Sequence, residues 1–222
     1  MLKFPEMPYE RPDIEAAKQF LAQAAARLEA AESFEAADAV FVEVNGRSTQ
    51  LDTMFTISHI RHDINTEDKF YDAEVEYADA VLPELEEYVD RWNRSLVGSK
   101  WRPQLEEKYC SIAFLNKEID MRTFSPEIVP ELQKENDLTT EYDKLIASAQ
   151  IPFEGGVYTL SQLSPFKTGA DDAQRLAAWK AEGAWYMSHK DKLDSIYDEL
   201  VHLRDAMGKK LGHSDYIPLG YD

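Results

Sequence analysis

Histidine pairs are the first candidates for chemistry in this chain, because a metal site would have to be built mainly from its five histidines and from carboxylates. His59 and His62 stand three residues apart on a predicted helix, close enough to share a face. A zinc-peptidase helix needs two histidines four residues apart, with a glutamate directly after the first to act as general base on the metal-bound water. Ile60 occupies that position. We therefore interpret the pair as helix-surface or interhelical histidines.

A second candidate is the Glu199-x-x-His202 step, which supplies two ligands from one helix in four-helix di-iron proteins. Those proteins need the step twice, and no other histidine here has a glutamate three residues before it. Cys110 has no signature around it, so a buried structural thiol is expected. The sequence thus names no catalytic residue and no metal ligand, it predicts no cofactor in this chain, and it leaves substrate-binding residues unknown.

Composition excludes several partners. The 222 residues carry 42 acidic and 24 basic side chains, a formal net charge of -18. Such a chain repels phosphate backbones and anionic lipid unless it has a basic stripe, and it has none, so we expect neither a nucleic-acid nor a membrane partner. A single cysteine, no leader-like start and no membrane-length apolar run favour a cytoplasmic protein.

Helical periodicity dominates the pattern. Three prolines predict an extended arm over residues 1–12, after which Asp13 stands as the N-cap of an alanine-rich amphipathic helix. A second apolar stripe runs from Tyr71 to Leu96. Ser125 and Pro126 begin a further helix that is expected to reach Ala149.

In the last third of the chain, the helical pattern is interrupted. Two short apolar segments flank Gly155-Gly156, which predicts a β-hairpin over Ile151–Tyr158. A helix start follows at Asp171 and Asp172, and a long apolar stripe closes on Gly212 as C-cap. The fold class is therefore mainly α, expected as an elongated antiparallel helical bundle with one small β-hairpin.

Several long segments in the second half resemble the N-terminal half of oligoendopeptidase F and the Pz-peptidases, zinc metallopeptidases of the M3 class. The first hundred residues share only the helical texture and acidic character. The segments that carry the resemblance are Arg122-Thr123-Phe124-Ser125-Pro126-Glu127-Ile128, Leu132-Gln133-Lys134-Glu135-Asn136, Glu141-Tyr142-Asp143-Lys144-Leu145-Ile146-Ala147-Ser148-Ala149, Tyr158-Thr159-Leu160-Ser161-Gln162-Leu163, Lys209-Lys210-Leu211-Gly212-His213 and Leu219-Gly220-Tyr221.

The resemblance implies an almost all-helical enzyme whose halves enclose a channel, in which a zinc-bound water hydrolyses short peptides. The family takes its zinc on a His-Glu-x-x-His helix, which this sequence lacks, so the chain alone is predicted to be inactive. Together, the residue pattern and the resemblance predict three regions. They are an extended arm at 1–12, an N-terminal helical domain at 13–150, and a hairpin and long helices at 151–222 that lead into a catalytic domain absent from this chain. The expected partners are that catalytic half, in cis or in trans, and short peptides.

Two functions stay open at this point. In the first, the chain is the non-catalytic N-terminal region of a zinc-dependent oligoendopeptidase and forms one wall of its channel. In the second, it is a stand-alone helical binding or interaction module without peptidase activity.

One segment gives conflicting signals. Val40, Val42 and Val44 alternate before Asn45-Gly46, which by local rules indicates a strand and a turn. The resemblance and the helical spacing of apolar residues from Leu51 onward favour one long helix over Ala36–Ile64, since a glycine costs only about 1 kcal/mol inside a helix. We expect the helix.

Overall fold

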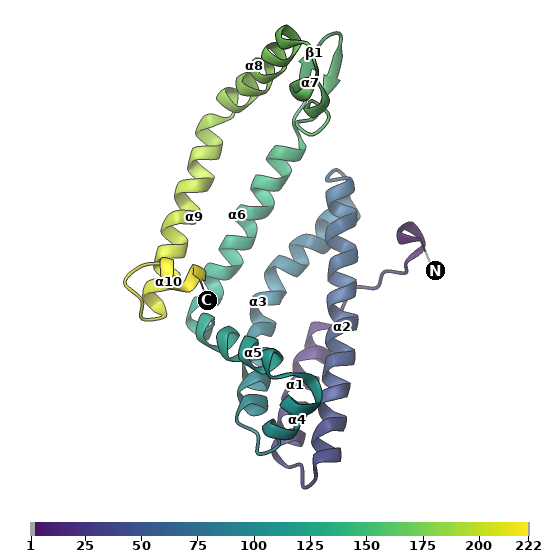
Figure 1. The fold of residues 1–222 in the computed structure, drawn as a ribbon, viewed down its shortest axis with the longest axis vertical. Helices are drawn as coiled ribbons and strands as arrows, with labels where there is room; N and C mark the ends of the chain where they lie inside the picture. The colour runs from purple at the N-terminus through teal and green to yellow at the C-terminus, as the bar shows by residue number, and fades with distance from the viewer. Residues whose placement is uncertain (1–2, 222) are drawn as a thin grey trace. The chain divides into compact units, whose positions relative to one another are not determined.

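The computed structural model describes residues 3–221, which form ten α-helices and one two-stranded hairpin (Figure 1). The helices are α1 (Ile14–Glu29), α2 (Phe34–Ile64), α3 (Lys69–Val97), α4 (Arg102–Tyr109), α5 (Ser111–Thr123), α6 (Val129–Ala147), α7 (Ser164–Thr168), α8 (Asp172–Ser188), α9 (Lys190–Lys210) and α10 (Ile217–Tyr221). The strands are β1 (Ile151–Phe153) and β2 (Gly156–Tyr158), and 3₁₀ turns lie at Phe4–Glu6 and Pro126–Ile128. The predicted class, mainly helical with one small hairpin, is confirmed.

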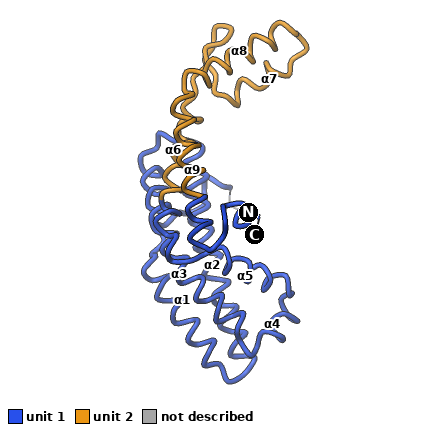
Figure 2. Tube along the Cα trace, turned by 90° about the vertical axis from the view of Figure 1, so that its left-hand side faces the viewer, with its two compact units in different colours: residues 1–133, 205–222 blue, residues 134–204 orange. Residues whose placement is uncertain are grey.

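The chain divides into two compact units (Figure 2). Unit 1 contains the described residues up to Gln133 together with those from Asp205 onward, and unit 2 is Lys134–Arg204. Within the described chain, no helix is long and apolar enough to cross a membrane.

The core of unit 1 lies where α1, α2 and α3 pack together. Each of these helices begins at a polar cap: Asp13 Oδ1 accepts from the Ala16 N–H at 2.9 Å, Ser33 Oγ from the Ala36 N–H at 3.2 Å, and Asp68 Oδ1 from the Phe70 N–H at 3.0 Å. The cap predicted at Asp13 is confirmed. Burial of one apolar face per helix stabilises the packing; the largest buried side chains include Leu28, Phe41, Trp92 and Leu96.

The segment with conflicting signals is helical, so the expectation of one long helix is confirmed and the local strand pattern is wrong. A strand would place Val40, Val42 and Val44 on one face. Instead Val40 and Val44 are buried, one helical turn apart, while Val42 is 52% exposed. Gly46 faces open space, and the packing of α2 against α1 and α3 overrides its low helix propensity.

Unit 2 contains the hairpin and α8. Ile151 pairs with Tyr158 and Phe153 with Gly156, which confirms the predicted hairpin. The two turn residues are Glu154 (φ 46°) and Gly155 (φ 81°), both left-handed, as a type I′ turn requires. β1 packs against α8, and their contact forms a small core; its buried members are Ala149, Ile151, Phe153, Leu163, Ala178 and Trp185.

The C-terminal end of α9 confirms the predicted cap. Gly212 has φ 87°, its N–H donates to the Lys209 carbonyl at 3.1 Å, and the His213 N–H donates to the Gly208 carbonyl at 2.9 Å. These two bonds are the Schellman pattern, which satisfies carbonyls that the end of a helix otherwise leaves unpaired.

Candidate functional site

The structure does not bring the histidine pair together as a metal site. His62 is buried on α2, with Nδ1 3.5 Å from Asp63 Oδ1 and Nε2 3.6 Å from Asp72 Oδ1. His59 lies half-buried one turn earlier. Among residues 3–221, no three His, Cys, Asp or Glu side chains are grouped so that they could hold a metal ion. The donor set therefore does not fit zinc, and no step through zinc is derived from this chain.

Glu199 and His202 also lie on the surface of their helix and form no metal site with other residues of the described part of the chain. Glu199 Oε2 lies 3.9 Å from Lys134 Nζ, and the His202 ring nitrogen Nδ1 lies 2.8 Å from the Asp198 carbonyl oxygen. Both side chains are largely exposed. Exposed ion pairs of this kind contribute little to stability.

Cys110 differs from the expectation of a buried thiol, which is wrong. The side chain is exposed, and the residue has φ 81° at the junction where α4 ends and α5 begins. Its N–H closes α4 by donating to the Glu106 carbonyl at 2.9 Å. The sequence pattern gave no sign of a helix break at this position.

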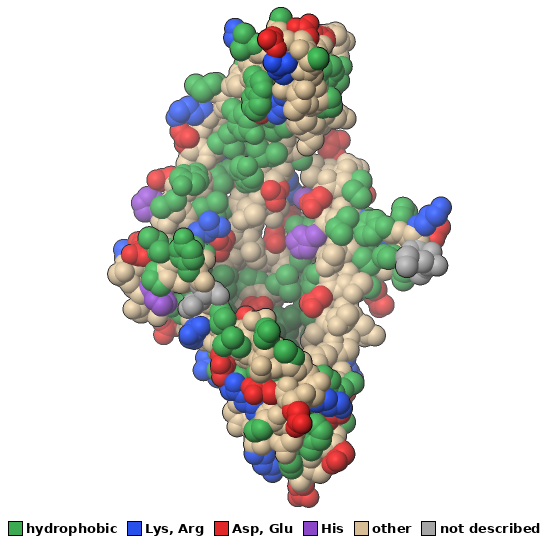
Figure 3. Space-filling model, in the orientation of Figure 1, with side chains coloured by type: hydrophobic (Ala, Val, Ile, Leu, Met, Phe, Trp, Pro, Cys, Tyr) green, Lys and Arg blue, Asp and Glu red, His purple; other side chains and the backbone are tan. Residues whose placement is uncertain are grey.

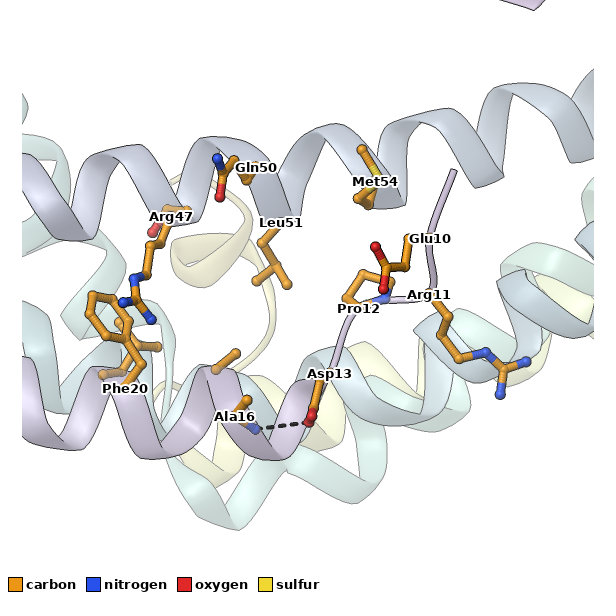
Figure 4. Close-up of a pocket in the computed structure, with 13 residues that line it drawn as sticks. Glu10, Arg11, Pro12, Asp13, Ala16, Phe20, Arg47, Gln50, Leu51 and Met54 are labelled. Carbon is orange, nitrogen blue, oxygen red and sulfur yellow. Dashed lines mark hydrogen bonds between the residues drawn. The ribbon is translucent and has the colours of Figure 1, made fainter. Parts of the chain in front are cut away.

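A groove in unit 1 lies beside the N-terminal arm (Figure 4). It lies between α1 and α2, with residues 10–13 of the arm along one side, and its volume is about 510 Å³. That size falls within the usual range of small-molecule sites. The apolar lining comes from both helices and the arm: Pro12, Ala16, Ala17, Phe20, Leu21, Leu51 and Met54.

Charged groups mark the rim of this groove. The Arg47 guanidinium lies over the Phe20 ring, 4.0 Å from its centroid, and also pairs with Glu43 at 3.1 Å. Glu10 lies on the arm beside Pro12 (Figure 4). The groove is also lined by Arg11, which pairs with Glu74, and by Asp13, which caps α1. An apolar floor with charged groups of both signs at its rim is suited to an amphipathic ligand such as a short peptide.

The arm is fastened to α3 through a buried carboxylate. Glu74 is only 3% exposed; Arg11 donates to both of its carboxylate oxygens, from Nε at 2.9 Å and from Nη2 at 2.5 Å, and the Tyr9 hydroxyl donates at 2.6 Å. The bonds from Arg11, followed by the bond from Tyr9, hold the pKa of Glu74 below its ordinary value. Burial and the bond to Glu74 raise the pKa of Tyr9. We call the contact of Arg11 and Tyr9 with Glu74 the Glu74 latch. It holds the arm in place along its side of the groove.

An acidic surface lies where α2, α3 and α5 approach one another. The Glu86 side chain is exposed, but the protein atoms around it partly desolvate its carboxylate, and this raises its pKa. Repulsion from the carboxylates of Asp120, Asp52 and Asp90 raises the pKa of Glu86 further. Lys117 lowers this pKa, and Asp90 is itself paired with Arg94 at 2.7 Å. A surface with this balance attracts cationic groups.

Comparisons with known proteins agree with this architecture. The family model for the peptidase M3 N-terminal domain matches residues 4–124. Most of that range precedes the segments on which the sequence resemblance rested, so the family signal also runs through the first hundred residues. No curated protein matches the chain.

Solved structures match over nearly the whole chain. Pz peptidase A, solved with inhibitor 2, is 42% identical with a TM-score of 0.94, and the match covers 99% of this chain and 39% of that one. An X-ray structure assigned to oligoendopeptidase F is 39% identical with a TM-score of 0.95, covering 100% and 39% of the two chains. A protein of Bacillus anthracis str. Ames, also assigned to oligoendopeptidase F, is 35% identical with a TM-score of 0.95, covering 100% and 41%.

The chain therefore belongs to the peptidase M3 family. Within that family it corresponds to the N-terminal domain of oligoendopeptidases of the oligoendopeptidase F and Pz-peptidase type. It spans about two-fifths of the length of the solved chains it matches. Sequence reasoning missed the groove and the contact of Arg11 and Tyr9 with Glu74. The contact joins residues more than sixty positions apart, and the groove joins the arm to residues as far along the chain as Met54. The proline-rich arm was the only local signal.

Proposed function

We propose that this chain is the N-terminal, non-catalytic region of a zinc-dependent oligoendopeptidase that hydrolyses short peptides, and that it forms one wall of the substrate channel. The observation that carries the proposal is the match of residues 4–124 to the peptidase M3 N-terminal domain and of nearly the whole chain to about two-fifths of longer peptidases, while its own sequence holds no His-Glu-x-x-His segment. Zinc, the general base and bond cleavage then belong to the catalytic half, joined in cis or supplied in trans. The single cysteine supports a cytoplasmic setting.

What this chain contributes to the enzyme is the binding of the peptide. The acidic surface around Glu86 attracts the ammonium group and basic side chains of a peptide, and the groove between α1 and α2 offers an apolar recess for one side chain. Rigid helices hold both features, which suits the positioning of a flexible substrate.

The alternative is a stand-alone binding module, and the groove is the observation that favours it, because a cavity of about 510 Å³ needs no catalytic half to bind a ligand. Fluorescence anisotropy with labelled short peptides separates the two functions. Tight binding by the chain alone that Arg47→Ala abolishes would favour the module.

A chimera tests the main proposal. This chain replaces the matched N-terminal segment of Pz peptidase A, and a quenched fluorescent peptide reports cleavage in the presence of zinc. We expect turnover by the chimera and none by this chain alone. Zinc-dependent cleavage by the isolated chain, abolished by a chelator and by His59→Gln, would refute the proposal.

A further inference from the structure

Helix α8 is apolar on two opposite sides. Its inner side carries Ala178 and Trp185, which are buried against the hairpin and Leu163. This side packs α8 against the hairpin, and a separate contact with α7 includes the Lys167–Glu182 ion pair.

The opposite side is also apolar, although it is exposed. Leu176 is 56% exposed, Trp179 55%, Tyr186 39% and Met187 69%. At about 100° per residue these four side chains fall within an arc of about 100°, centred about 140° from the buried side. Hydrophobic side chains gather along this helix in the space-filling view (Figure 3). We call these four residues the outer face of α8.

Such a distribution is unusual for a surface helix, whose second face is normally polar. Half of the large hydrophobic side chains that remain exposed in the described chain lie in unit 2, which is about a third of its length. Contiguous exposed apolar side chains mark interaction surfaces, and tryptophan and tyrosine are the residues that contribute most at such surfaces.

Charge and length decide which partner fits. A chain of net charge -18 is poorly suited to an anionic membrane, and two copies repel each other. In contrast, about three-fifths of the Pz peptidase A chain lies outside the segment that matches here. That part is large enough to bury a helix face.

We propose that the outer face of α8 is the docking surface for the catalytic half of the M3 peptidase. The inference rests on the proposed function, and it adds the surface through which the two halves join. Trp179 and Tyr186 act as aromatic anchors, with Leu176 and Met187 beside them. Lys167 Nζ lies 4.7 Å from the centroid of the Trp179 ring, so the anchor is already held in place before docking.

Peroxide oxidation of Met187 measures whether the face is covered. Peptide mass mapping follows the reaction in the isolated chain and in the Pz peptidase A chimera described above. We expect oxidation to be at least about tenfold slower in the chimera, because a docked partner excludes peroxide from the thioether. The unfolded chimera supplies the unprotected rate.

Substitution provides the second measurement. Leu176→Asp is expected to leave the melting temperature of the isolated chain nearly unchanged, since the side chain is exposed there, and to lower that of the chimera by several degrees. The matched control is Val42→Asp, an equally exposed aliphatic residue on α2 of unit 1, whose effect should be the same in both proteins.

The outcomes separate the two proposals. A chimera that cleaves peptide with zinc, but in which Met187 oxidises as fast as in the isolated chain and Leu176→Asp has no added effect, overturns the docking surface and leaves the proposed function standing. A chimera that shows neither turnover nor protection of Met187 counts against both. Protection of Met187 in the isolated chain that grows with concentration would assign the face to a second copy and overturn the proposal.

Discussion

At the scale of single residues, the buried carboxylate of Glu74 has the clearest energetic role. It accepts from the Arg11 guanidinium and the Tyr9 hydroxyl, so it joins the arm to α3 through charge-assisted bonds. Its neighbours make the ionised form the stable one, which links the attachment of the arm to pH.

The first prediction concerns Glu74→Gln. Because the folded-state pKa lies below the ordinary value of 4.5, Glu74 stabilises the fold above about pH 4.5, and this contribution is lost as pH falls through the folded-state pKa. The variant should lose about 2 kcal/mol of unfolding free energy at pH 7, a typical value for a bond to a charged group. Urea unfolding between pH 7 and pH 3 should show the difference from wild type shrinking towards acid pH.

Glu10→Gln is the matched control, since Glu10 is exposed on the same arm. It should change the unfolding free energy by no more than about 0.5 kcal/mol. A Glu74→Gln deficit that stays constant from pH 7 to pH 3 would show that the carboxylate charge contributes nothing.

The hairpin turn supplies the second prediction. Gly155 has φ 81°, a conformation that costs other L-residues about 1–2 kcal/mol. Gly155→Val should therefore destabilise unit 2 by at least that amount, while Gly155→Asn should cost much less, because asparagine tolerates the left-handed region. Thermal unfolding followed by circular dichroism compares the two variants, and equal losses would contradict a backbone origin.

At the scale of elements, two glycines inside long helices have opposite expectations. A Cβ at Gly46 in α2 meets nothing within 4 Å, whereas one at Gly208 in α9 would lie 2.4 Å from the Asp215 carbonyl oxygen. Gly46→Ala should stabilise the chain by about 0.5–1 kcal/mol, because alanine loses less backbone entropy on folding. Gly208→Ala should destabilise it through the backbone clash.

Urea unfolding of both variants checks this third prediction. Both variants add the same methyl group to a glycine inside a helix, but Gly46 lies in the middle of α2 and Gly208 in the last turn of α9. A loss of stability in Gly46→Ala would mean that the glycine serves a purpose other than continuing the helix.

Helix α8 has apolar side chains on two sides. Its inner apolar side packs against the hairpin, whereas Leu176 and Met187 on its outer face stay exposed. The proposed docking of the catalytic half would cover this exposed face.

At the scale of the whole molecule, the fourth prediction concerns zinc. A catalytic zinc normally has three protein ligands, and the described residues offer no such group. Isothermal titration of the isolated chain with zinc should show no one-to-one binding, and His59→Gln and His202→Gln should leave the titration unchanged. A saturable one-to-one isotherm that either substitution removes would contradict the prediction and move part of the metal site into this chain.

The sequence by itself determined the kinds of element and many of their ends. The N-cap at Asp13, the 3₁₀ turn that Ser125 caps ahead of α6, the hairpin at Ile151–Tyr158 and the C-cap at Gly212 depend on interactions between residues a few positions apart. Local chemistry is enough to specify them, because the same short segment supplies both donor and acceptor. The absence of a His-Glu-x-x-His segment is likewise a property of the sequence alone.

Only the tertiary structure decided which side chains lie together and which stay open. The segment from Val40 to Gly46 is helical because α1 and α3 bury one side of it, although its local pattern favoured a strand. Glu74 reaches Arg11 across 63 positions, and the groove joins the arm to α2. Burial and long-range ion pairs are set by segments far apart in the chain, so no short pattern could have shown them.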